Sequence, residues 1–249
     1  SYLTEIVSDF SYSTLRFAEL ALTKLWTQLY DGIEVHHFDT VRELAKDYEI
    51  VYTPCHRSHI DYLLLSYVVY RVGLTVPHIA AGANLNLPLV GGILRRGGAF
   101  FLRRSIKGDE LYGEVFAAYV HEVLRRGFPM EYFVEGGRSR TGRMLPPKAG
   151  LISMTVQSYL REHSRPLLFV PVYIGYEKLI EGGSYTQELA GAAKRNAFHD
   201  VVDGCNAGCA ANGDNGFCAQ VGCEAHFSVS CSRARARIRG VVVGRWTTV

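Results

Sequence analysis

The fold of this 249-residue chain is organised around one stretch, Glu49-Ile-Val-Tyr-Thr-Pro-Cys-His-Arg-Ser-His-Ile-Asp-Tyr-Leu-Leu-Leu-Ser-Tyr-Val-Val-Tyr-Arg71. Its first four residues are typical of a β-strand, Pro54 leads into a polar turn, and the apolar residues that follow recur at helical spacing. Strand, turn and helix in this order often place reactive side chains at the edge of a sheet. We therefore expect the chemistry of the chain to centre on this turn.

His56 and Asp61 are the two candidate catalytic residues of the turn. On one continuous helix five residues correspond to a rotation of about 500°, so the two side chains would not share a face. They can meet only if His56 lies in the turn and Asp61 in the first helical turn, with Ser58 as the expected N-cap. An aspartate that holds one imidazole nitrogen leaves the other free to take a proton from a hydroxyl, which suits general-base catalysis. The alternative is a capping or core histidine beside an ordinary first-turn acid.

The rest of the patterned chain alternates between strands and helices. Helical spacing predicts helices at 12–30, 109–126 and 150–162, a short one with a Thr40/Glu43 capping box that ends near Asp47, and a turn or helix at 88–94. Apolar runs predict strands at 78–81, 97–104, 130–134 and 165–176, the last of them containing Pro171 at an edge or a bulge. This alternation predicts an α/β fold with a mixed, largely parallel sheet flanked by helices. Reactive groups should gather at the carboxyl ends of its strands.

Three segments follow from these patterns. Residues 1–47 are expected to be an N-terminal helical segment, and 48–195 the catalytic domain. Residues 196–249 lack lasting periodicity and are expected to be an irregular tail, disordered or non-native. Five of the six cysteines lie in this tail, with spacings that match no paired zinc-binding pattern, so we expect no metal site. Cys55 alone belongs to the patterned part, which favours a reduced, intracellular domain.

Charge is unevenly distributed along the chain. The net charge is +3, but residues 95–148 hold eleven Lys or Arg against six Asp or Glu, a local net of +5. A basic centre in a nearly neutral chain favours small anionic ligands or an anionic surface and not a nucleic acid. Residues 72–94 carry no charged side chain, but their prolines and glycines make a poor membrane-spanning helix. We expect buried strand and loops there, resting on a membrane surface.

Two basic motifs follow predicted strands. Arg103 and Arg104 end the strand predicted at 97–104, where a guanidinium at the sheet edge suits phosphate or carboxylate; the alternative is two solvated arginines. The loop from Glu135 to Arg143 combines three arginines with three glycines, which allow close backbone approach to an anion. Its alternative is a charged hairpin in which Glu135 pairs with an arginine. No nucleotide-binding P-loop pattern is present.

These blocks, in this order over about residues 45–195, resemble the glycerolipid acyltransferases, and most closely the bacterial membrane-associated glycerol-3-phosphate acyltransferases. The resemblance identifies His56 and Asp61 as the catalytic pair of the first motif. It implies that the acceptor is bound by residues of three further motifs: Phe101, Arg103 and Arg104 of the second, Glu135, Gly136, Arg138 and Ser139 of the third, and Pro171 of the fourth. Beyond about residue 196 the resemblance ends. Members of the family are longer at both ends, so the chain is expected to be a catalytic fragment.

The resemblance implies transfer of a fatty acyl group from acyl-CoA or acyl carrier protein to the 1-hydroxyl of sn-glycerol 3-phosphate, which gives lysophosphatidate in the first step of phospholipid synthesis. It implies no cofactor beyond the acyl donor, no metal and a peripheral place on the cytoplasmic side of the inner membrane. Lysophosphatidate or dihydroxyacetone phosphate as acceptor is an alternative, as is a non-catalytic module that binds lipid or anions. A covalent route through Cys55 ranks below direct attack.

Overall fold

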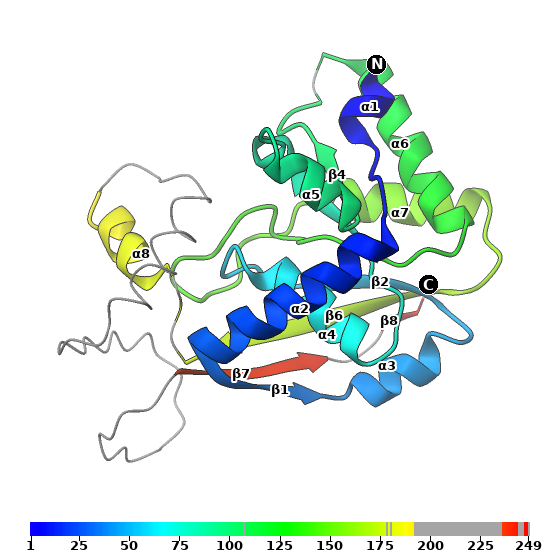
Figure 1. The fold of residues 1–249 in the computed structure, drawn as a ribbon. Coiled ribbons are helices and arrows are strands. Elements are labelled where there is room, and N and C mark those ends of the chain that lie inside the picture. The colour runs from blue at the N-terminus through cyan, green and yellow to red at the C-terminus, as the bar shows by residue number, and fades with distance from the viewer. Residues whose placement is uncertain (107, 178, 180, 192–235, 244–246, 249) are drawn as a thin grey trace.

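A computed structural model describes residues 1–191 except 107, 178 and 180, together with 236–243 and 247–248. Its centre is a sheet with helices on both faces (Figure 1). The strands are β1 (Tyr30–His36), β2 (Glu49–Pro54), β3 (His78–Gly82), β4 (Ala99–Leu102), β5 (Met130–Glu131), β6 (Leu167–Tyr176), β7 (Ala236–Val243) and β8 (Thr247–Thr248).

The sheet has the order β1-β7-β6-β2-β5-β3-β4, and β8 also pairs with β6. Strands β6, β2, β5, β3 and β4 are mutually parallel, whereas β7 runs antiparallel to β6 and parallel to β1. The predicted α/β class with a mixed, largely parallel sheet is confirmed. The carboxyl ends of the five parallel strands meet at one edge, where the polar motifs begin.

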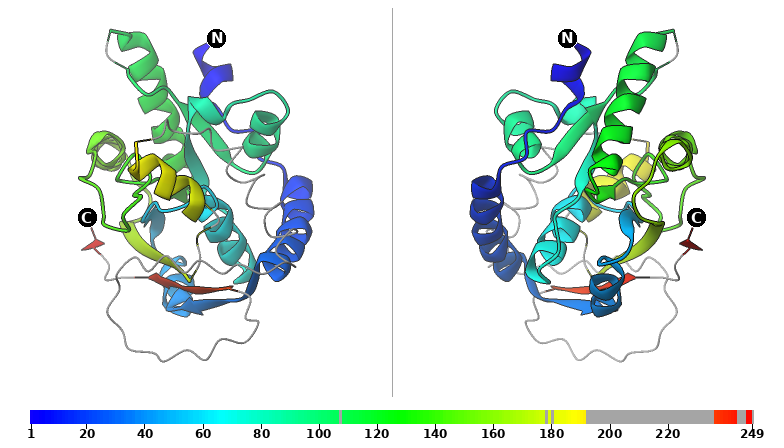
Figure 2. Two further views of the ribbon diagram at one scale, coloured as in Figure 1. Left: turned by 90° about the vertical axis from the view of Figure 1, so that its left-hand side faces the viewer. Right: turned by 90° about the vertical axis from the view of Figure 1, so that its right-hand side faces the viewer.

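The helices form two layers over the sheet (Figure 2). They are α1 (Tyr2–Ile6), α2 (Tyr12–Leu29), α3 (Phe38–Leu44), α4 (Asp61–Arg71), α5 (Val90–Arg96), α6 (Glu110–Arg125), α7 (Gly150–Arg161) and α8 (Gly182–Leu189), with a 3₁₀ turn at Ala83–Leu85. Side chains of α2, α3 and α4 cover one face of β2 and β6, and those of α1, α6 and α7 cover the other.

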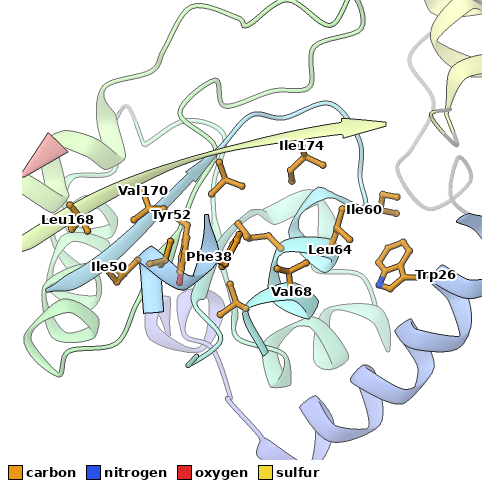
Figure 3. Close-up of a cluster of buried hydrophobic side chains, with 14 of the residues drawn as sticks. Trp26, Phe38, Ile50, Tyr52, Ile60, Leu64, Val68, Leu168, Val170 and Ile174 are labelled. Carbon is orange, nitrogen blue, oxygen red and sulfur yellow. The ribbon is translucent and has the colours of Figure 1, made fainter. Parts of the chain in front are cut away.

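Successive side chains of β2 enter these two cores in alternation. Ile50 and Tyr52 belong to the cluster with Trp26, Leu64 and Val68 (Figure 3). Val51, between them, lies in the opposite cluster with residues of α6. Successive side chains of a strand point to opposite faces, so a strand with helices on both sides is apolar throughout. This explains why β2 reads as a continuous apolar run.

Several local expectations are wrong. The helix α3 begins at Phe38 after His37, whose φ is 64°, so Thr40 is inside the helix and is not its cap. Ile60 precedes α4, and Ser58 is not its N-cap. The segment 1–47 is not all helical, because it contains β1.

Pro171 lies neither at an edge nor at a bulge. Strand β6 is inside the sheet, and Pro171 pairs with Thr53 in regular parallel register. On the other side of β6, the described pairing with β8 covers Leu168 and Phe169, and that with β7 starts at Val172. Proline has no N–H to donate, and it occupies the interval between these two partners.

Part of the tail that we expected to be irregular forms two strands. Residues 236–243 and 247–248 form β7 and β8, where the sequence analysis assigned no secondary structure. Strand β7, which includes Ile238, Val241 and Val242, pairs with β1 on one side and with β6 on the other. All five tail cysteines lie outside the described residues, and so does the expectation about a metal there.

Candidate active site

The turn after β2 brings His56 and Asp61 together. The Nδ1 atom of His56 lies 3.1 Å from Oδ2 of Asp61, which is the first residue of α4 and is fully buried. An ionised carboxylate can only accept hydrogen bonds, so Nδ1 carries the proton and Nε2 keeps its lone pair. The imidazole stacks on Phe133 at a ring separation of 3.9 Å and is 15% exposed. This is the tautomer that a general base requires.

Asp61 is held by a dense set of donors. Its Oδ2 also accepts from the backbone N–H groups of Arg57, at 2.6 Å, and Ser58, at 2.8 Å. Its Oδ1 accepts from the Tyr176 hydroxyl at 2.6 Å. Burial and the charge of Asp61 raise the pKa of Tyr176 well above its usual value, so the phenol stays a donor. Asp61 itself therefore caps the turn, in the role that the sequence assigned to Ser58.

Glu181 stabilises the same turn from the far side. Both of its carboxylate oxygens accept from the Ser58 hydroxyl at 2.8 Å, and one accepts from the backbone N–H of His59 at 2.8 Å. Burial, with Arg138 nearby, lowers the pKa of His59 to about 3, so this imidazole is neutral. The segment after β6 thus fixes the backbone between the two catalytic candidates.

The third motif holds the main chain of His56. Glu135 accepts the His56 N–H at 2.9 Å and, with its other oxygen, the Leu145 N–H at 2.7 Å. The N–H of Ser139 donates to the His56 carbonyl at 2.8 Å. Gly136 has φ of +58°, and a Cβ there would lie 2.7 Å from the Lys148 side chain. Glu135 and Ser139 are buried, so in this structure they brace the histidine.

Arg138 lies inside the site but is not open to solvent. Its side chain is 8% exposed, donates to the Tyr185 hydroxyl at 2.9 Å and lies 3.9 Å from Glu181. Tyr185 in turn donates to the Arg57 carbonyl at 2.7 Å. Helix α8 and the residue before it therefore cover the guanidinium that the sequence assigns to the acceptor.

The second motif divides into three different environments. Arg103 forms a bidentate ion pair with Glu5, both contacts at 2.7 Å, and a third contact with Asp109 at 2.9 Å. Arg104 is exposed and, among the described residues, has no hydrogen-bonded or ion-paired partner. Phe101 is fully buried, with the Arg95 guanidinium 4.7 Å above its ring. Of these residues Arg104 is the one available to a soluble anion.

Two further residues bear on the chemistry. Burial raises the pKa of the Cys55 thiol to about 11, which keeps it protonated and a poor nucleophile. Burial also raises the pKa of Glu131, on β5, well above its usual value, and neither of its carboxylate oxygens has a partner in the described part of the chain. Burial without a partner therefore favours the neutral form of Glu131.

Sequence reasoning missed Tyr176 and Glu181. Tyr176 ends β6, and the rule that functional groups follow the carboxyl ends of parallel strands could have found it. Glu181 carries no such signal, because its partners are about 120 residues earlier in the chain. Pro171 lies in β6 beside β2, and Val172 next to it accepts the Cys55 N–H at 2.9 Å.

The arrangement supplies a base, a fixed tautomer and an exposed cation at one sheet edge, which is what transfer of a group to a hydroxyl needs. Among the residues whose side chains the structure describes, no three His, Cys, Asp or Glu side chains gather as a metal site. The family model for acyltransferases matches residues 32–175, and the chain belongs to the acyltransferase family.

The chain is also similar to individual curated proteins. The chain is 59% identical over 194 residues to a glycerol-3-phosphate acyltransferase of Ectopseudomonas mendocina (strain ymp), a match that covers 78% of this chain and 24% of the relative. It is 60% identical over 194 residues to one of Pseudomonas aeruginosa (strain UCBPP-PA14), covering 78% and 23%. The chain thus spans about a quarter of the length of these curated relatives.

Among solved structures, the crystal structure of the 1-acyl-sn-glycerophosphate acyltransferase of Thermotoga maritima matches with a TM-score of 0.46 and 22% identity, over 64% of this chain and 57% of that one. Within the described residues, no helix combines the length and the apolarity needed to cross a bilayer.

Proposed function

We propose that the chain is the catalytic part of an enzyme that transfers a fatty acyl group to the 1-hydroxyl of sn-glycerol 3-phosphate and forms lysophosphatidate. The observation that carries the proposal is the pair of His56 and Asp61, in which Nδ1 contacts the carboxylate and Nε2 keeps the lone pair of a base. The names of the relatives in Ectopseudomonas and Pseudomonas support this acceptor.

The reaction follows from this pair. Nε2 of His56 takes the proton of the acceptor hydroxyl as the oxygen attacks the thioester carbonyl of acyl-CoA or acyl carrier protein. The carbon–oxygen bond forms, the carbon–sulfur bond breaks, and the proton passes from the imidazolium to the leaving thiolate. Asp61 stabilises the imidazolium in between. A positioned base of this kind contributes about 10²- to 10⁴-fold to a rate.

Phosphate recognition falls to the basic residues at the same edge. Arg104 is exposed and is our candidate for direct contact with the acceptor phosphate. Arg138 contributes its charge from behind Tyr185 and binds phosphate directly when it exchanges the Glu181 contact for the ligand. Glu135, Gly136 and Ser139 shape the site through the backbone of His56. Arg103 supports Arg104 through its pairing with the N-terminal segment.

The remaining residues of the resemblance take supporting roles in this proposal. Phe101 is buried in β4 and Pro171 lies in β6 beside β2, so both support the site from within the sheet and do not contact the acceptor directly. Residues 48–195 carry all the proposed catalytic and binding groups. No metal or cofactor enters the scheme, in which the acyl donor is a co-substrate.

We also propose that the enzyme works at the cytoplasmic face of the inner membrane as a peripheral protein. The segment before α5 and the helix itself support this, because Leu87 and Leu89, which precede α5, and Ile93, within it, are 45%, 87% and 62% exposed. No acidic side chain lies between residues 72 and 94, so nothing in that segment repels an anionic surface.

The test is an assay of acyl transfer to radiolabelled glycerol 3-phosphate, with palmitoyl-CoA and with acyl carrier protein as donors. It uses this chain and a chimaera in which the chain's matching segment replaces that of the Ectopseudomonas relative. We expect labelled lysophosphatidate from the chimaera, abolished by His56→Ala. Product only with lysophosphatidate or dihydroxyacetone phosphate as acceptor would move the proposal to those substrates. Phosphate binding without turnover in either protein would favour a non-catalytic module and overturn it.

A further inference from the structure

Tyr176 makes the contact on which the further inference rests. Its hydroxyl donates to Asp61 Oδ1 at 2.6 Å, whereas the three other donors to this carboxylate, including His56 Nδ1, all contact Oδ2. In the described part of the chain, Tyr176 is thus the sole hydrogen-bond donor to Oδ1. The two oxygens of the carboxylate are held from opposite sides.

This geometry fixes the plane of the carboxylate. A carboxyl group attached to one sp³ carbon turns easily, since its terminal torsion is broad. Three donors on Oδ2 hold one oxygen in place, but the plane is determined only when Oδ1 is held as well. The Tyr176 ring is itself restrained, because it ends β6 and packs 6.3 Å from the ring of Tyr30. A rigid strand therefore sets the direction from which Asp61 meets His56.

The same contact adjusts the charge that His56 feels. A short bond from a phenol draws electron density from the carboxylate and so weakens its attraction for an imidazolium. The other charged or titratable groups around the pair are Cys55, Arg57, His59, Glu131, Glu135, Glu181, Tyr30 and Tyr62. All of these stay in place if only the Tyr176 hydroxyl is removed.

We propose that Tyr176 is a positioning residue of the catalytic pair, acting through Asp61 to fix and moderate the general base. This inference rests on the proposed acyl transfer for its kinetic consequences, but its structural content does not. Nothing in the sequence motifs marks the residue, because it lies four positions beyond the Phe169–Val172 block.

The experiment compares Tyr176→Phe with Tyr132→Phe in the active chimaera. Tyr132 is a matched control, since it is also a tyrosine with a bonded hydroxyl, donating to Thr155 at 3.2 Å, and does not touch Asp61. A hydrogen bond to a charged group contributes up to about a hundredfold, and Asp61 keeps three donors, so we expect kcat of Tyr176→Phe to fall about tenfold. The KM for glycerol 3-phosphate should change less than about twofold.

The pH profile separates positioning from simple loss of structure. Without the phenol the carboxylate attracts the imidazolium more strongly, so the acid limb of kcat/KM should move to higher pH in Tyr176→Phe and stay in place in Tyr132→Phe. Wild-type kcat and an unmoved acid limb in Tyr176→Phe would overturn the proposal. An equal loss in both variants would also overturn it, because a buried hydroxyl in general would then explain the effect.

A spectroscopic measurement keeps this inference separate from the proposed function. In histidine-labelled protein, the resonance of the His56 Nδ1 proton, assigned by its absence in His56→Ala, reports the contact with Asp61. We expect it to move in Tyr176→Phe and not in Tyr132→Phe, whether or not the protein turns over. A moved resonance in a protein without acyl transfer would refute the proposed function alone. An unmoved resonance would refute the role of Tyr176.

Discussion

Replacing Asp61 with asparagine should remove the charge of the proposed catalytic pair while keeping its shape. Nδ1 of His56 and Oδ2 of Asp61 lie 3.1 Å apart. At an effective dielectric constant of about 20, two unit charges at this distance attract by about 5 kcal/mol. Each 1.36 kcal/mol is tenfold in rate, so complete loss corresponds to between about 10³- and 10⁴-fold. The amide oxygen still accepts from the imidazole, and we expect a fall in kcat of about 10³-fold.

The turn should survive this substitution. The asparagine oxygen can keep the contacts with the N–H groups of Arg57 and Ser58, and its NH₂ group can donate to the Tyr176 oxygen, since a phenol also accepts. Charge-assisted bonds become neutral ones, so the free energy of unfolding should fall by about 1–3 kcal/mol. Most of the protein should therefore remain folded at assay temperature.

The assay is steady-state acyl transfer to glycerol 3-phosphate, paired with thermal unfolding of each variant. Asp109→Asn is the matched control, because that carboxylate also accepts a backbone N–H, from Tyr112 at 3.0 Å, but it lies at the N-cap of α6 and does not contact His56. If folded Asp61→Asn kept more than about a tenth of the wild-type kcat, the charge would not serve the base. An equal loss in Asp109→Asn would assign the effect to folding.

Three further predictions follow from the environments of single residues. Arg104→Ala should raise the KM for glycerol 3-phosphate about ten- to a hundredfold, whereas Arg103→Ala should mainly lower the melting temperature. A rise in the KM for the acyl donor alone in Arg104→Ala would contradict this. Cys55→Ala should keep most of its kcat, and alkylation of Cys55 at pH 7 should be slow, because its thiol has a pKa of about 11; fast alkylation would count against this. Glu131→Gln should stabilise the protein increasingly above about pH 4.5. Burial raises the pKa of Glu131, so this carboxyl keeps its proton to higher pH in the folded state than in the unfolded state, and the stability of the native protein falls as pH rises. Calorimetry of both proteins at pH 5 and pH 8 measures the difference, and an equal effect of the substitution at both pH values would refute the prediction.

Much of the parallel sheet was accessible from the sequence because local signals agree there. Strand β2 reads as an apolar run of β-formers, and helices α2, α6 and α7 show clear helical spacing within a residue or two of the predicted bounds. Weaker elements escaped because tertiary contacts determine them. Strand β1 contains a glycine and charged residues, and it is completed by pairing with β7 over 200 residues away.

The sequence could suggest the residues of the candidate site but not the contacts between them. The five-residue spacing of His56 and Asp61 required a turn-to-helix junction, which is what the structure has. That Glu135 would bind the backbone of His56 depends on the pairing of β2 with β5, which no short motif records. Hydrogen bonds between loops distant in sequence depend on the register of strands, so the sequence pattern marks the residues and leaves their partners open.

The hydrogen bonds that hold His56 and Asp61 have a consequence for synthesis on the ribosome. The backbone of His56 is held by Glu135 and Ser139, and its aspartate partner by Tyr176, so the contacts of one turn depend on residues made 79 to 115 positions later. A nascent chain that ends before Tyr176 contains the whole first motif but lacks the strand end that holds Asp61. Under the proposed function, we expect such incomplete chains to be inactive until the last parallel strand has emerged and joined the sheet.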